Sequence, residues 1–291
     1  MLAASRRDLV NLVLVGAIWG SSYLVMRHSG AYLGPLPIIG VRLFSSALFY
    51  LPLVTHWGMW GDIRRLSFKL FWLALLNTAV PFCLACYGAT QLHAGVAALL
   101  NATVPLFTSL VALLWLKEHL HAGQWLGVFF GFAGVALLLG ERIGFQVGFQ
   151  PLAALSTMAA AAMYGLCTNG VKRYLGGEDG RLLACGSTLW AALLLLPIAA
   201  WTVPRSGAVP AWVWGEVLWL GVMGTGVAYL LYFDLLTRIG PTRASAVTYL
   251  IPLFATLWGW LILGEVITWG EIGCGVLVAL AVWLVNRSKG S

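Results

Sequence analysis

Ten apolar segments follow one another along this chain, each long enough to cross a lipid bilayer as a helix. A helix needs roughly 20 apolar residues to span ~30 Å of hydrocarbon, so ten such helices with short turns use nearly all 291 residues. Only 9% of the residues are charged, too few to cover the surface of a soluble domain. The sequence therefore predicts an all-α integral membrane protein, with transmembrane helices near residues 8–28, 35–55, 69–88, 93–115, 121–140, 150–174, 181–202, 212–236, 240–263 and 268–286.

The basic residues lie mainly on one side of these predicted helices. With the N-terminus in the cytoplasm, 13 Lys and Arg residues fall in cytoplasmic stretches and 4 on the other side. Cytoplasmic loops carry such an excess, so both termini are predicted to be cytoplasmic. The net charge of +7 is explained by these loops, and no stripe of basic residues indicates nucleic-acid binding. Arg6 and Arg7 precede the first apolar segment as in a signal peptide, but its length predicts an uncleaved helix.

No motif for catalysis or for metal binding is evident. The five cysteines lie inside apolar segments, which favours buried, reduced thiols over disulfides. Cys83 and Cys86 form a CxxC that is interpreted as packing, and His119 and His121 lack companion ligands for a metal. A membrane enzyme would need paired acids or a nucleophile with its base, and a channel a filter or a ring of charge. We therefore expect no enzyme activity, cofactor or metal, and keep a polytopic enzyme or a channel as the less favoured alternatives.

An internal repeat divides the chain into two halves. At a constant offset of 147, Thr78 matches Thr225, and the segment PLFTSLVALLWLKE (105–118) aligns without gaps with PLFATLWGWLILGE (252–265). We predict two repeats of five helices, residues 1–145 and 146–291. Because five is odd, the second copy must enter the membrane from the opposite side, and inverted repeats of this kind are typical of transporters that work by alternating access.

Two prolines occupy equivalent places in these matched segments, Pro105 and Pro252. Each is predicted to lie in mid-helix, where it removes a backbone donor and frees a carbonyl one turn earlier. We interpret both as hinges, with a static kink as the alternative. Gly16 and Gly20 are predicted to allow close helix packing in the first helix; we expect a monomer or a weak homodimer.

Arg42 is the charge that lies most clearly inside a predicted helix. A charged residue within the membrane is a functional candidate, here for binding a substrate carboxylate. Its position near the outer end of its helix leaves snorkelling or bonding to loop carbonyls as an equal alternative. All ten acidic residues fall at predicted helix ends or in loops, so facilitated diffusion is as well supported as proton coupling, for which His93 is the titratable candidate.

The opening AIWGSSYLVMRHSG, Arg42 and the paired 105–118 and 252–265 segments resemble the EamA-type, ten-helix members of the drug/metabolite transporter superfamily. Within that group the chain is most similar to bacterial exporters of aromatic and other amino acids. The resemblance implies a central cavity lined by the first, third and fourth helices of each repeat. It makes substrate-binding candidates of Arg42 and of the polar and aromatic residues in those helices: Trp19, Ser22, Tyr23, Asn77, Thr78, Phe82, Tyr87, His93, Asn101, Tyr164, Asn169, Tyr229, Tyr232, Thr248 and Tyr249.

The same resemblance makes Glu118 and Glu265, the repeated acids, candidates for gates that pair with loop cations, with helix capping as the alternative. It implies a multi-pass protein of the bacterial inner membrane whose partners are the lipid bilayer and a small-molecule substrate. The expected function is export of aromatic and other neutral amino acids by alternating access. Another metabolite or drug, such as a nucleoside, a nucleotide sugar or an amphiphilic compound, is the alternative substrate.

Overall fold

The computed structural model describes residues 6–117, 120, 122–145, 150–204, 209–239 and 247–287, and within these ranges all regular structure is helical. Eight helical runs are long and apolar enough to cross a membrane, and α14 and α15 are shorter apolar helices. The prediction of an all-helical membrane protein is confirmed. The first half contains α1 (Arg6–Ser29), α2 (Pro35–His56), α3 (Trp60–Arg65), α4 (Ser67–Leu73), η1 (Ala74–Ala79), α5 (Val80–Gln91), α6 (Ala94–Asn101), α7 (Val104–Trp115) and α8 (Ala122–Phe145).

The second half follows the same order with fewer interruptions. It contains α9 (Pro151–Tyr174), α10 (Gly180–Thr202), α11 (Ala211–Gly221), η2 (Val222–Val227), α12 (Ala228–Ile239), α14 (Val247–Leu263) and α15 (Trp269–Arg287). The runs α4–η1–α5 and α11–η2–α12 are each one continuous span with a π-helical segment in the middle. The short helix α3, in the turn after α2, was not predicted.

The segment predicted as one helix over 93–115 is divided in two. α6 ends at Asn101 and α7 begins at Val104, with Pro105 in its first turn. Proline has no N–H to donate, so the chain makes a tight turn in which the Thr103 hydroxyl donates to the carbonyl of Leu100 at 2.6 Å. Pro105 therefore begins a helix and does not lie in mid-helix as predicted, whereas Pro252 lies inside the unbroken α14.

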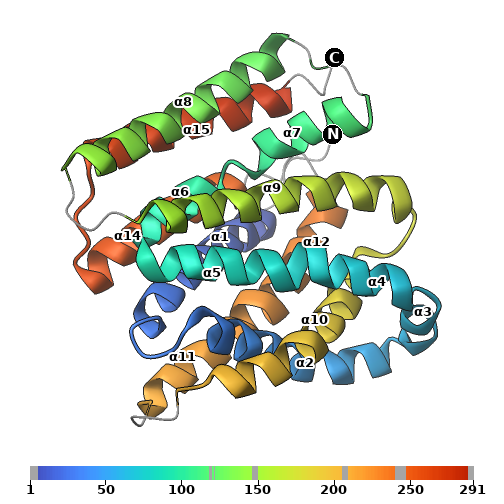
Figure 1. Cartoon of the computed structure of the whole chain (residues 1–291). Helices are drawn as coiled ribbons and strands as arrows, with labels where there is room; N and C mark the ends of the chain where they lie inside the picture. Colours follow the sequence, from blue (N-terminus) through green and yellow to red (C-terminus); the bar gives the residue numbers. More distant parts are fainter. Residues whose placement is uncertain are drawn as a thin grey trace.

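The helices pack in pairs drawn from the two halves. α8 runs along α15 at one edge of the molecule, as Figure 1 shows, and α2 packs along α10. α1 contacts α14 and α12 of the second half, while α9 contacts α7 and α5 of the first, so these contacts between the halves form repeat-related pairs. Gly16 and Gly20 lie against Leu250 and Phe254 of α14, which confirms the close packing predicted for them.

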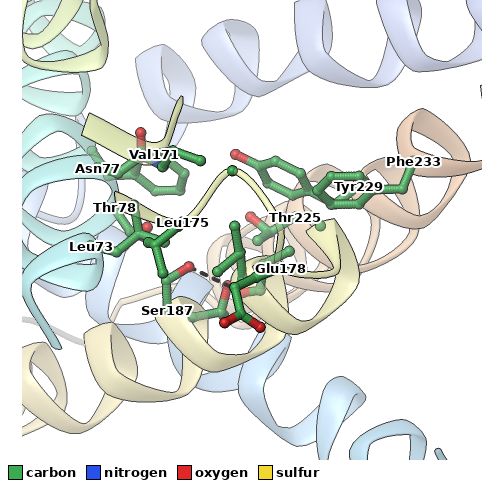
Figure 2. A pocket seen from close by; sticks show the side chains of 16 residues that line it. Leu73, Asn77, Thr78, Val171, Leu175, Glu178, Ser187, Thr225, Tyr229 and Phe233 are labelled. Atoms are coloured by element: carbon green, nitrogen blue, oxygen red, sulfur yellow. Dashed lines mark hydrogen bonds between the residues drawn. The ribbon is translucent and has the colours of Figure 1, made fainter. Parts of the chain in front are cut away.

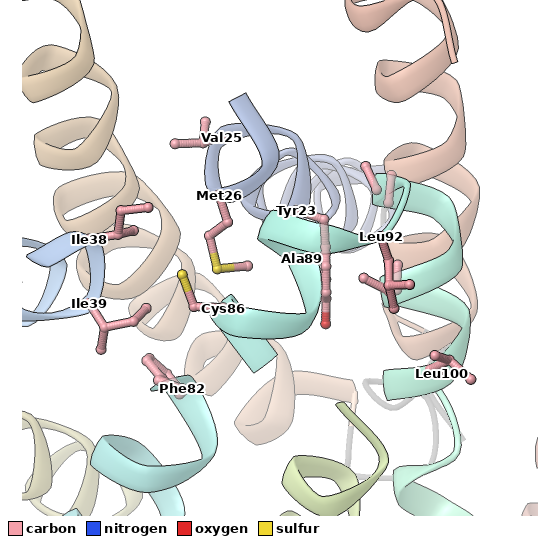
Figure 3. Packing of buried hydrophobic residues seen from close by; sticks show 14 of the residues in the cluster. Tyr23, Val25, Met26, Ile38, Ile39, Phe82, Cys86, Ala89, Leu92 and Leu100 are labelled. Carbon is pink, nitrogen blue, oxygen red and sulfur yellow. The ribbon is translucent and has the colours of Figure 1, made fainter. Parts of the chain in front are cut away.

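The largest buried cluster lies at the middle of these pairs. Figure 3 shows Met26 of α1 beside Cys86 of α5, with Ile38 and Ile39 of α2 and the ring of Phe82 packed around them. All five cysteines are free thiols, and four of them are buried, as the sequence predicted. The same cluster forms the wall of the cavity described next.

Candidate functional site

A cavity of about 190 Å³ lies between the two halves, where α1, α2, α5, α6, α9, α12 and α14 converge. It brings together eight of the residues predicted from the sequence: Trp19, Ser22, Tyr23, Arg42, Phe82, Asn101, Tyr164 and Tyr229. Met26, Ala85 and Ile251 complete the lining and were not predicted. We call this space the central cavity.

Arg42 provides the positive charge of the central cavity. Its side chain is buried, and its Nε donates to Thr225 Oγ1 at 2.9 Å, across the interface between the halves. Its guanidinium carbon lies 4.4 Å from the centre of the Phe82 ring, a cation–π contact. Among the described residues no carboxylate forms an ion pair with Arg42, and no acceptor takes a hydrogen bond from either Nη. Two strong donors are thus available to a bound anion.

Asn101 provides an unpaired acceptor in the same cavity. It is the last residue of α6, and its Oδ1 atom is buried with no hydrogen-bond partner among the described residues. A buried carbonyl oxygen without a partner costs roughly 1–3 kcal/mol. A ligand that carries a donor, such as an ammonium group, would remove that cost.

Aromatic rings form the walls between these polar groups. The ring of Trp19 lies 5.6 Å from that of Tyr229, and Phe82 lies 6.4 Å from Tyr164, both in edge-to-face geometry. The indole Nε1 of Trp19 donates to the carbonyl of Gly224 at 3.0 Å, which fixes the orientation of the ring. The walls are therefore suited to an apolar or aromatic group.

The π-helical segments bring side chains to the backbone across the interface. In η2, the carbonyl of Thr225 accepts from the Tyr50 hydroxyl at 3.0 Å. The carbonyl of Gly221, directly before η2, accepts from Ser46 Oγ at 2.8 Å. A π-helical turn leaves the i→i+4 ladder incomplete and recurs at functional sites. Thr225 was missed as a site residue, although its match with Thr78 in the repeat was the signal that could have found it.

A second cavity, of about 320 Å³, adjoins the first. We call it the vestibule. Figure 2 shows Asn77 and Thr78 of η1 on one side of it and Thr225 and Tyr229 on the other. Asn77 and Thr78 were both predicted, and Glu178, in the turn between α9 and α10, lines its surface end.

An ion pair closes the surface end of the vestibule on one side. Both Nη atoms of Arg65, in α3, donate to Glu178, with distances of 3.2 and 2.9 Å. These bonds hold the pKa of Glu178 below its ordinary value of 4.5. Both side chains of the pair are therefore charged at neutral pH.

Six predicted residues lie outside both cavities. The Nδ2 of Asn169 donates to the carbonyls of Thr108 and Gly165, both at 2.9 Å, so it joins α9 to α7. The ring of Tyr232 lies 5.2 Å from that of Trp19 in a tilted arrangement, and Tyr87 packs on the main core. Thr248 and Tyr249 line an apolar groove of about 530 Å³ between α6, α14 and α15. His93 lies at the start of α6, 3.8 Å from Glu271.

Glu265 joins three helical elements at the opposite end from the vestibule. Its Oε2 accepts from the backbone N–H of Ala94, the first residue of α6, at 2.9 Å. Its Oε1 lies 3.6 Å from Nε of Arg27, near the end of α1. Both readings of this residue, cap and ion-pair partner, are thus present in the geometry. Glu118 lies outside the described residues.

Comparison with known proteins decides the family. A sequence model of the EamA-like transporter family matches residues 8–140 and, a second time, residues 151–287. The chain belongs to the EamA-like transporter family. As predicted, it is a member of the drug/metabolite transporter superfamily and a multi-pass transporter of the inner membrane.

Several relatives are similar to this EamA-like transporter over nearly their whole length. An uncharacterized transporter of Archaeoglobus fulgidus is 23% identical, covering 96% of this chain and 98% of its own. The uncharacterized inner membrane transporter YedA of Escherichia coli K12 is 28% identical, over 94% and 88%. A probable terminal-alkyne amino-acid exporter of Streptantibioticus cattleyicolor is 24% identical, over 95% and 92%. One crystal structure has the same fold, with a TM-score of 0.68 at 18% identity over 98% of this chain and 99% of that one.

Proposed function

We propose that this transporter exports neutral amino acids, aromatic ones included, by alternating access. The observation that carries the proposal is the pair of unsatisfied polar groups in the central cavity. The substrate carboxylate binds the Nη atoms of Arg42, its ammonium group donates to Asn101 Oδ1, and its side chain lies among Trp19, Phe82 and Tyr164. A zwitterion with an apolar side chain matches all three features at once.

The size of the central cavity also favours a small substrate. Sites for drug-sized ligands occupy roughly 300–1,000 Å³, whereas this cavity is about 190 Å³. Nucleotide sugars and large amphiphiles, the alternatives within the superfamily, are therefore less well matched. The name of the Streptantibioticus relative, a probable amino-acid exporter, agrees with this choice.

The repeat supports alternating access. The family matches each half of the chain once, and the halves meet in repeat-related pairs of contacts, such as α1 with α12 and α9 with α5. We propose that residues 1–145 and 146–291 form two inverted five-helix repeats, giving ten transmembrane helices. Exchange of their conformations would open the central cavity to one side and then to the other.

Gating in this scheme falls to Glu265 at one end and Glu118 at the other. The contacts of Glu265 with Arg27 and with the start of α6 tie together α1, α6 and the turn after α14. Breaking them would open the end opposite the vestibule. We propose the repeat-related role for Glu118, and a hinge role for the turn at Pro105 and for Pro252.

The test is counterflow of radiolabelled phenylalanine, tryptophan and threonine in proteoliposomes, with and without an imposed pH gradient. We expect saturable flux without a gradient. Because charge-assisted hydrogen bonds contribute about 1.5–3 kcal/mol, Arg42→Gln should weaken phenylalanine binding about tenfold to a hundredfold. Arg181→Gln is the matched control, since Arg181 is exposed and pairs with Asp179 outside the cavity. Flux that persists unchanged in Arg42→Gln would refute the carboxylate site.

Absence of flux of all three amino acids in the wild-type protein would refute the amino-acid assignment. Flux that appears only with the pH gradient would show that transport is coupled to protons and is not facilitated diffusion. Trp19→Ala should reduce phenylalanine flux more than threonine flux, because only the aromatic substrate loses a stacking partner.

A further inference from the structure

Two described side chains line both the central cavity and the vestibule, Phe82 and Tyr229. The other described residues that line one cavity do not line the other. These two rings therefore lie at the boundary between the two spaces, which we call the partition, beside the hydrogen bond between Arg42 and Thr225.

Phe82 and Tyr229 occupy equivalent positions in the two halves. They are 147 positions apart, the same offset that relates Thr78 to Thr225. Each ring lies one helical turn after the threonine of its π-helical segment, Phe82 after η1 and Tyr229 after η2. The partition thus contains one ring from each repeat. Each ring belongs to a helix that directly follows a π-helical segment, where the regular hydrogen bonding is interrupted.

Arg42 contacts both sides of this partition. Its guanidinium covers the Phe82 ring at 4.4 Å, and its Nε holds Thr225, one turn before Tyr229 on the same run of helix. An anion bound to the guanidinium would neutralise the charge that attracts the ring, since a cation–π contact depends on the cation's field. The substrate and the Phe82 ring therefore compete for the same cation.

We propose that Phe82 and Tyr229 form an aromatic gate between the central cavity and the vestibule, held closed by Arg42 and released when a carboxylate binds that guanidinium. The gate itself depends only on the cavities, while its release by a carboxylate rests on the proposed function.

The test measures access to a single cysteine in a variant whose five native cysteines are replaced by serine or alanine. Ser22→Cys reports on the central cavity and Ser187→Cys on the vestibule. A membrane-impermeant thiol reagent is applied from the vestibule side. Because loss of a desolvated cation–π contact corresponds to roughly thirtyfold in an equilibrium, Phe82→Ala should speed labelling of Ser22→Cys roughly thirtyfold. Labelling of Ser187→Cys should not change.

Two further variants separate a gate from a folding defect. Phe82→Leu keeps an apolar side chain in the core and should give an intermediate rate, and Tyr229→Ala should speed labelling independently of Phe82. Equal labelling of Ser22→Cys with and without the Phe82 ring, in protein that remains monodisperse, would overturn the gate.

Phenylalanine then tests the release. In the intact gate it should speed labelling of Ser22→Cys from the vestibule side, and in Arg42→Gln it should have no effect. A ring-dependent rate that phenylalanine does not alter would refute release by substrate. It would leave the gate in place, so failure of the gate and failure of the amino-acid proposal are distinguishable.

Discussion

Gly221→Ala tests how closely α2 and α11 must approach to place Arg42. A Cβ atom built at Gly221 overlaps the hydroxyl of Ser45 and the backbone oxygen of Arg42. The serine hydroxyl can rotate away, but a backbone oxygen cannot move without its helix. The two helices must therefore separate, and overpacking of this kind costs about 1–3 kcal/mol.

Separation also weakens two hydrogen bonds that cross the same interface. Ser46 Oγ donates to the carbonyl of Gly221 at 2.8 Å, and Arg42 Nε donates to Thr225 at 2.9 Å. A neutral hydrogen bond contributes about 0.5–1.5 kcal/mol and one to a charged group about 1.5–3 kcal/mol. With partial loss of both, the expected destabilisation is about 3 kcal/mol.

The assay is the Tm of the purified protein in detergent. A loss of about 3 kcal/mol predicts a Tm lower by about 5 °C for a chain of 291 residues. The matched control is Gly215→Ala in the same helix, where an added Cβ meets nothing within 4 Å; its Tm should stay the same or rise, since alanine favours a helix. Equal Tm values for the two variants would refute the close approach. A lower Tm for Gly221→Ala should be accompanied by weaker phenylalanine binding, because Arg42 is displaced.

Three further outcomes follow from single contacts. Asn101→Leu removes a buried oxygen that has no partner among the described residues, so Tm should be unchanged or higher while phenylalanine binding falls; a parallel loss of both would make Asn101 structural. Arg65 holds the pKa of Glu178 below its ordinary value of 4.5, so this ion pair stabilises the fold above that pH and is lost below it. The Tm difference between wild type and Arg65→Gln should therefore shrink as the pH falls below 4.5 and through the lowered pKa of Glu178, and its persistence at still lower pH would exclude the pair as the cause. Glu265→Gln removes the charge opposite Arg27 but keeps an acceptor for the first N–H of α6, so Glu265→Ala should speed labelling of a central-cavity cysteine from the opposite side more than Glu265→Gln does.

The sequence predicted the helices well because a bilayer sets their length. Runs of about 20 apolar residues leave little choice of structure, and the eight long spans and two shorter apolar helices fall where the hydropathy placed them. The repeat offset also identified Thr78 and Thr225 as equivalents, and the two threonines line one vestibule.

The side-chain partners of the site could not be predicted in the same way. Arg42 is held by Thr225, 183 residues away, and no local pattern specifies a contact at that separation. Asn169 resembled a cavity residue by composition, yet its amide joins two helices. The π-helical segments have no signature in the residues themselves; in η2 the carbonyl of Thr225 accepts from the Tyr50 hydroxyl, which lies 175 residues away.

The unequal state of the two proline segments bears on the energy of the transport cycle. Residues 102 and 103 form a turn between α6 and α7, whereas their equivalents, 249 and 250, are helical in α14. If the halves exchange conformations, the first segment must become continuous as the second breaks. The number of backbone hydrogen bonds in these segments is then about the same in the two end states. The backbone of these segments therefore favours neither conformation, and a substrate gradient of modest size is enough to set the direction of transport.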